Sequence, residues 1–129
     1  MAWLFYRFAS PAAFYPVARV LAPWFMAAAG LLAIAGLYIG LIAAPTDFQQ
    51  GDAYRIIYIH VPAAWMSMLI YVVMAFYAVL YFSFSTRLSA MMMHALAPTG
   101  AMFTFLALWT GALWGRPTWG TQWVWDARL

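Results

Sequence analysis

The chain has 129 residues, of which 68% are hydrophobic and 7% charged, and it contains no lysine. A small globular protein must expose most of its residues to water, so this composition predicts an all-α integral membrane protein instead. The six arginines are scattered singly, which argues against a nucleic-acid partner. The absence of cysteine excludes disulfides, thiolate metal sites, thiol catalysis and a covalent haem-attachment motif.

The N-terminal part of the chain predicts an interfacial segment followed by a first membrane span. Residues 1–19 are rich in aromatic side chains, are broken by Pro11 and Pro16, and are expected to lie in the headgroup zone. Residues 20–44 form an uncharged apolar run. At the helical rise this run covers about 37 Å, enough to cross a hydrocarbon core of roughly 30 Å with some tilt. A polar loop at 45–55 follows.

Two further spans are predicted, at 56–82 and 90–113, joined by a short loop at 83–89 that contains Arg87. His60 lies close to the start of the second span, and His94 close to the start of the third. Alternation places the loop 45–55, His60 and the C-terminal stretch on one side of the membrane. The N-terminus, Arg87 and His94 are on the other side. Each side carries three arginines, so the positive-inside rule leaves the orientation open.

The C-terminal stretch 114–129, WGRPTWGTQWVWDARL, holds half of the tryptophans of the chain, at positions 114, 119, 123 and 125. Two glycines and a proline argue against a regular helix through its first part, so an ordered loop is expected, with its indole faces held by a short helical turn or two. Isolated tryptophans would most simply form an aromatic belt at the membrane interface. Their density, the glycines and the closely spaced Asp126 and Arg128 instead favour a surface for a large, flat, partly apolar ligand with a charged edge.

The ionisable residues narrow the choice of ligand. His60 is a functional candidate because an ionisable group in a span is expensive, although an interfacial histidine bonded to a neighbouring loop is the alternative. Arg55, Arg116 and Arg128 could anchor spans to headgroups or bind carboxylates through paired donors. No nucleophile–base pair, phosphate loop or paired-carboxylate site is present, which argues against ordinary hydrolytic or phosphoryl-transfer chemistry. Haem fits these features, because indoles stack on porphyrin, imidazole binds iron and arginine binds propionates.

Several stretches resemble one family. WGTQWVWDARL, preceded by WGRPT, resembles the WWD signature of the haem-handling proteins of cytochrome c maturation, above all the haem exporter protein C (CcmC) family. Related families usually follow the Trp-Asp pair with proline and a glutamate, whereas here Ala127, Arg128 and Leu129 follow, as in the C protein. FQQGDAYRIIYIHVPAAWMSM at 48–68 and FASP at 8–11 are also similar to that family.

The resemblance implies a function in c-type cytochrome biogenesis. The chain would be the N-terminal half of a six-helix protein of the bacterial inner membrane, as a fragment or a truncated product. Its N-terminus would be cytoplasmic, and its loop 45–55 and tryptophan-rich stretch would face the periplasm. It would carry haem b as transient cargo to a periplasmic haem chaperone, beside ABC-type ATPase and permease subunits and a small membrane subunit. His60 would be an axial iron ligand, and the family's second external histidine is missing here.

The interpretation that follows is a binding and transfer protein and not an enzyme. Arg55 and Arg128 would hold the haem propionates, His60 would coordinate the iron, and Asp126 would lock the C-terminal stretch through hydrogen bonds. The porphyrin platform would be formed by Trp114, Trp119, Trp123 and Trp125. The alternative functions are a quinone-reactive subunit of a membrane oxidoreductase and a structural subunit of such a complex.

Overall fold

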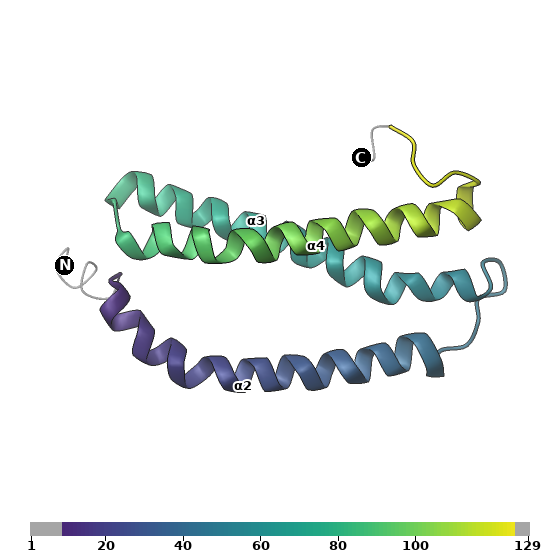
Figure 1. Ribbon diagram of the computed structural model, residues 1–129, viewed down its shortest axis with the longest axis horizontal. Coiled ribbons are helices and arrows are strands. Elements are labelled where there is room, and N and C mark those ends of the chain that lie inside the picture. Colours follow the sequence, from purple (N-terminus) through teal and green to yellow (C-terminus); the bar gives the residue numbers. More distant parts are fainter. Residues whose placement is uncertain (1–8, 126–129) are drawn as a thin grey trace.

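The computed structural model describes residues 9–125, which form an all-α structure dominated by long helices (Figure 1). The first long helix, α2, covers Pro11–Tyr38 and continues into a π-helical turn, η1, at Ile39–Ala43. After a loop, a short 3-10 helix, η2, at Asp52–Ile56 leads into α3 at Ile57–Phe84. The last helix, α4, covers Arg87–Trp119.

Each long helix, taken with its short extension, can cross a membrane. The segments Pro11–Ala43, Asp52–Phe84 and Arg87–Trp119 have 33 residues each and mean hydropathies of 2.2, 2.0 and 1.4. At about 1.5 Å per residue each is about 50 Å long, against a hydrocarbon core of roughly 30 Å. The predicted all-α membrane protein with three spans is therefore confirmed, and each segment is longer than the thickness of the core.

Helix α2 begins earlier than the predicted span at 20–44. Ser10 caps its N-terminus by accepting a hydrogen bond from the Ala13 amide at 3.4 Å, and Pro11 occupies the first turn. Proline suits that position because its backbone angle is already helical and its missing amide has no partner there. Residues 11–19 are thus helical, and the prolines that suggested a broken segment are accommodated in a helix that curves near its N-terminal end (Figure 1).

The link between α3 and α4 is shorter than the predicted loop 83–89, because it consists of Ser85 and Thr86 alone. Ser85 adopts a left-handed conformation with φ 52°, and its amide donates to the Tyr81 carbonyl at 2.7 Å. The buried hydroxyls of Thr86 and Ser89 are hydrogen-bonded to each other at 2.6 Å. This tight turn makes α3 and α4 an antiparallel pair.

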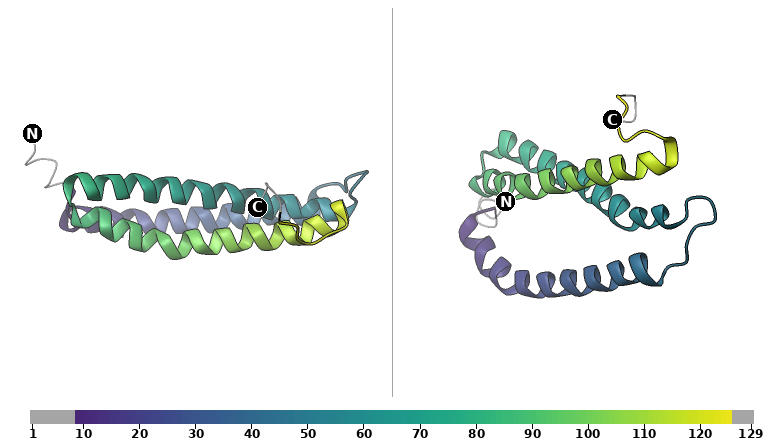
Figure 2. Two further views of the ribbon diagram at one scale, coloured as in Figure 1. Left: turned by 90° about the horizontal axis from the view of Figure 1, so that it is seen from above. Right: turned by 45° about the vertical axis from the view of Figure 1, so that its right-hand side comes forward.

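Helices α3 and α4 pack closely, whereas α2 stands largely apart from them (Figure 2). Ala63 and Ile70 of α3 are buried in the interface, and Gly100 of α4 admits the Ile70 side chain. The Ser67 and Thr104 hydroxyls are hydrogen-bonded across the interface at 2.9 Å. No residue of α2 itself is buried, and the segment formed by α2 and η1 (Pro11–Ala43, the α2 segment) makes only a few contacts with η2 and α3.

The arrangement of the helix ends agrees with the predicted alternation. The loop between η1 and η2, the start of α3 and the end of α4 lie at one end of the molecule (Figure 1). The start of α2 and the α3–α4 link lie at the other (Figures 1 and 2). His60 and the described tryptophans of the C-terminal stretch therefore belong to the same end, as the sequence predicted.

Candidate functional site

The first part of the tryptophan-rich stretch, from Trp114 to Trp119, is the regular end of α4, and the prediction that no regular helix runs there is wrong. Helix α4 continues through Gly115 and Pro117 and ends at Gly120, which has φ 79° and donates its amide to the Arg116 carbonyl at 3.0 Å. Pro117 lies in the last turn, where it removes only one helical hydrogen bond. Gly120 is the residue that stops the helix, because glycine adopts a left-handed conformation without strain.

The chain reverses after Gly120 and returns along α4 (Figure 1). A Cβ atom at Gly115 would lie 3.0 Å from the Thr121 carbonyl oxygen and 3.6 Å from Cε3 of Trp119. Glycine at this position therefore lets the returning segment pass close to the helix. Its role is close approach and not helix termination, which is why its presence misled the prediction of a loop.

A cavity of about 550 Å³ lies between α3, α4 and the returning segment. Its walls are mainly small apolar and aromatic residues, and its volume falls within the roughly 300–1,000 Å³ typical of ligand pockets. It is lined by His60, Ala64, Ala107, Leu108, Gly111, Ala112, Gly115, Trp119, Thr121, Gln122, Trp123 and Val124. The structure thus brings the predicted iron ligand and two of the predicted platform tryptophans into one cavity.

His60 is held against α4 through one of its ring nitrogens. Its Nδ1 lies 3.0 Å from the Ala107 carbonyl oxygen and 3.1 Å from the Thr110 hydroxyl oxygen. Glycine at position 111 makes room for the ring, since a Cβ atom there would lie 3.0 Å from Cε1. Within residues 9–125, Nε2 has no hydrogen-bond partner, and it is not a buried unsatisfied atom. A nitrogen that can bind a ligand is therefore accessible at the cavity.

Trp114 connects His60 to the loop before η2. Its ring packs edge-on against His60, with centroids 5.8 Å apart, and its indole Nε1 donates to Oε1 of Gln50 at 2.8 Å. The Asp47 carboxylate holds the turn that presents Gln50, because it accepts the amides of Gln49 and Gln50 at 2.9 and 2.8 Å. The loop thus supports the wall behind His60.

The four tryptophans do not share one plane. Trp119 and Trp123 line the cavity, while Trp114 packs against Trp119 at a centroid distance of 6.4 Å and a tilt of 47°. Trp125 contacts Trp123 edge-on, at 5.3 Å and 79°, and is 83% exposed. Two indoles therefore face the cavity, and the other two pack against them. Whether all four contact the ligand stays a prediction.

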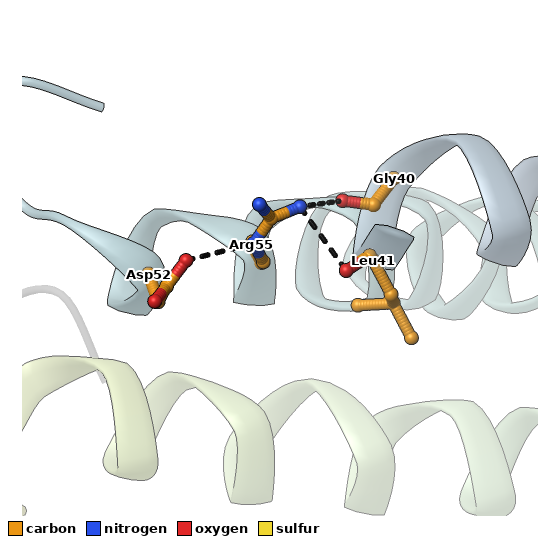
Figure 3. Close-up of polar contacts among 4 residues, drawn as sticks. All are labelled: Gly40, Leu41, Asp52 and Arg55. Carbon is orange, nitrogen blue, oxygen red and sulfur yellow. Dashed lines mark hydrogen bonds and ion pairs between the residues drawn. The ribbon is translucent and has the colours of Figure 1, made fainter. Parts of the chain in front are cut away.

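Arg55 of η2 lies beside Gly40 and Leu41 of η1 (Figure 3). It does not line the cavity. Its Nε donates to the Asp52 carboxylate at 3.0 Å, and its Nη1 donates to the Gly40 and Leu41 carbonyls at 3.4 and 3.1 Å. The guanidinium thus joins η2 to the end of the α2 segment. Its Nη2 makes no hydrogen bond to any residue between 9 and 125, so its predicted role in propionate binding stays a prediction.

The remaining ionisable residues that the sequence singled out are Asp126, Arg128 and His94. Asp126 and Arg128 lie outside the described residues, so their predicted roles are untested. His94 is exposed in the early part of α4, which begins at the opposite end of the molecule, as expected.

Prediction from the sequence missed the residues that shape the cavity. Ala107, Gly111 and Gly115 recur every four residues along α4, and this spacing places small side chains on one helix face. That pattern could have shown where a partner side chain fits. Thr110 and Gln50 carried no comparable signal, because single hydroxyl and amide residues are common near helix ends.

Comparison with known proteins identifies the family. A sequence model of "Heme exporter protein C" (CcmC) matches residues 4–129. The chain belongs to this family. It is 45% identical over 124 residues to the heme exporter protein C of Escherichia coli K12, covering 96% of this chain and 51% of that protein. The Haemophilus influenzae protein of the same name is 46% identical over 127 residues, covering 98% of this chain and 51% of that protein.

A further relative is a ccmC-like mitochondrial protein of Marchantia polymorpha, 50% identical over 106 residues, or 82% of this chain and 44% of that protein. The chain therefore spans about half the length of the curated relatives that it matches. The family resemblance inferred from the tryptophan-rich signature is confirmed.

Proposed function

We propose that this chain is the haem-binding part of a haem exporter that serves the biogenesis of c-type cytochromes. Haem b would be bound transiently as cargo in the cavity between α3, α4 and the returning segment. The observation that carries this proposal is the meeting of an accessible imidazole nitrogen with two indoles in one apolar cavity. A histidine and aromatic faces are the groups that bind haem iron and a porphyrin plane.

Different residues of the cavity would bind different parts of the haem. His60 would supply one axial nitrogen to the iron, and Trp119 and Trp123 would contact the porphyrin. Trp114 and Trp125 would support these two rings from behind. The small residues of α4 leave the space that a flat ligand needs. Because no part of this arrangement breaks or forms a bond in the cargo, we propose a binding and transfer protein and not an enzyme.

The propionates need donors at the edge of the cavity. Arg128 is our proposed partner, with Asp126 holding the C-terminal stretch in place. Arg55 would contribute through Nη2, which is not needed for its bonds to Asp52, Gly40 and Leu41. Paired guanidinium donors suit a carboxylate better than the single ammonium of a lysine.

The proposed setting is the inner membrane of a bacterium, with the tryptophan-rich end facing the periplasm and the N-terminus in the cytoplasm. Haem would pass from the cavity to a periplasmic haem chaperone. The protein would act beside ABC-type ATPase and permease subunits and a small membrane subunit. The names of the relatives, which refer to heme export, support this proposal.

The test is an optical titration of the purified full-length protein with haem. His60→Ala should change the haem spectrum, because an axial ligand sets the electronic state of the iron. Added imidazole should restore the spectrum in this variant. Trp119→Ala should leave the spectrum unchanged but weaken binding by about 1–3 kcal/mol, by analogy with base stacking on aromatic side chains.

Two results would contradict the proposal. If His60→Ala leaves the haem spectrum unchanged, His60 is not an iron ligand. If the protein binds a quinone analogue tightly and haem only weakly, the cavity is a quinone site.

A further inference from the structure

We propose that Thr110 is a positioning residue for the iron ligand. Together with the Ala107 carbonyl, its hydroxyl would hold His60 in the tautomer that carries the proton on Nδ1 and would present Nε2 to the haem iron. This inference rests on the proposed function and adds to it a residue that determines which nitrogen binds and how strongly it donates.

The two oxygen atoms that contact Nδ1 fix the tautomer of His60. The Ala107 carbonyl oxygen can only accept a hydrogen bond, so Nδ1, at 3.0 Å from it, must carry a proton. The Thr110 hydroxyl donates its own proton to the Leu106 carbonyl at 2.6 Å and can therefore only accept from His60 at 3.1 Å. Both partners of Nδ1 are thus acceptors, and in a neutral imidazole the lone pair is on Nε2.

The position of the ring is also defined from several sides. Thr110 is only 7% exposed, so its hydroxyl has little freedom to turn away from His60. The backbone of Gly111 passes close to Cε1, and the Trp114 ring packs edge-on against the imidazole. Thr110 therefore acts on a ring whose plane is already restricted, and its hydroxyl supplies an acceptor that α4 holds in a fixed place.

A hydrogen-bond acceptor at Nδ1 of a histidine changes how strongly its Nε2 donates electrons to a metal. Histidines that bind metals generally donate their other N–H to an oxygen acceptor, which fixes the ring and raises the basicity of the ligating nitrogen. A more basic axial ligand favours ferric over ferrous iron and lowers the midpoint potential of haem. Thr110 should therefore affect both haem affinity and haem potential without contacting the haem.

The chain offers a matched control at Thr104. Its hydroxyl also donates to a carbonyl four residues earlier, that of Gly100 at 2.9 Å, and also bonds across to α3, where it meets Ser67 at 2.9 Å. Thr104 does not line the cavity and does not contact His60. Thr104→Val thus removes the same kind of contact between α3 and α4 while leaving the iron ligand alone.

The experiment compares Thr110→Val, Thr110→Ser and Thr104→Val in the full-length protein purified from membranes. We expect Thr110→Val to bind haem about tenfold more weakly, at the low end of the usual range because the Ala107 carbonyl remains. Its midpoint potential should be more positive. Thr110→Ser keeps the hydroxyl and should behave like the wild type, as should Thr104→Val. If Thr110→Val does not fold, Thr110→Ala carries the same expectation.

The outcomes separate this inference from the proposed function. If His60→Ala changes the haem spectrum but Thr110→Val matches the wild type in affinity and potential, Thr110 is not a positioning residue. If Thr104→Val shows the same losses as Thr110→Val, the effect comes from helix packing and the inference fails. If His60→Ala leaves the spectrum unchanged, the proposed function fails, and this inference fails with it.

Discussion

The narrow space between α4 and His60 makes Gly111→Ala a sharp test of the site. An added Cβ atom would lie 3.0 Å from Cε1 and 3.5 Å from Nδ1 of His60. Carbon atoms in contact prefer a separation of about 3.5–4.0 Å. The imidazole would therefore have to move away from α4 by about half an ångström or more, which would stretch the hydrogen bonds of Nδ1 to Ala107 and Thr110.

The expected change in stability is small because two effects oppose each other. Alanine favours a helix interior over glycine by about 1 kcal/mol. Overpacking typically costs about 1–3 kcal/mol. We therefore expect the free energy of unfolding to fall by only about 0–2 kcal/mol, so the variant should still fold. A binding site must hold its side chains within about 0.5 Å of the productive geometry, so this displacement of the imidazole should lower haem affinity by about tenfold.

The assay combines haem titration with thermal unfolding, and Gly36→Ala is the matched control. A Cβ atom at Gly36 would have no neighbour within 4 Å, so this change should stabilise α2 by up to about 1 kcal/mol and leave haem binding unaltered. The reasoning is refuted if Gly111→Ala raises stability as Gly36→Ala does and binds haem with the affinity and spectrum of the wild type. The imidazole would then have free space that the structure does not give it.

Three further predictions concern the surroundings of the cavity. Gln50→Leu should leave Trp114 Nε1 without its acceptor and destabilise the end of α4 by about 0.5–1.5 kcal/mol, whereas Gln50→Glu keeps an acceptor. Amide hydrogen exchange in the last turn of α4 measures this difference, and equal exchange rates in the two variants would contradict the prediction. Arg55→Lys should weaken haem retention if Nη2 of Arg55 binds a propionate. Unchanged haem retention would mean that Arg55 serves only to bond Asp52 and the α2 segment. A reporter active only outside the cytoplasm should work when fused after Arg55 and fail near Arg87, and the reverse pattern would exclude the proposed orientation.

The fold could be predicted largely from hydropathy, while its helix boundaries could not. Long apolar runs are sufficient to identify spans, because a bilayer requires about 20 apolar residues in succession. The boundaries depend instead on capping, which single residues decide. Ser10 and Pro11 start α2 earlier than the apolar run does, and Ser85 turns the chain with a left-handed residue that is not glycine. Such a turn cannot be distinguished by composition from an ordinary serine in a helix.

Three of the residues that line the cavity, His60, Trp119 and Trp123, could be singled out from the sequence, but their geometry could not. His60 and the tryptophans stand out because an imidazole in a span and a dense group of indoles are rare and costly without a role. Their meeting in one cavity depends on the helix register of α3 against α4. That register follows from the short link at Ser85 and Thr86, and from contacts such as Gly100 with Ile70. It is a property of two helices together, so the spacing of small residues on α4 shows where a partner side chain fits but not which side chain of α3 lies there.

The same dependence on register explains why the residues around His60 matter more than their chemistry suggests. A change of one residue in the alignment of α3 with α4 would rotate Thr110 by about 100° around the helix axis, away from Nδ1. The Nδ1 proton of His60 would then lose its contact with the Thr110 hydroxyl, although the same amino acids were present. In the proposed haem site, the ligand strength of His60 would therefore be set by helix packing as much as by the histidine itself. For this reason, substitutions at Thr110 and Gly111 test the proposed haem site more directly than further changes among the tryptophans.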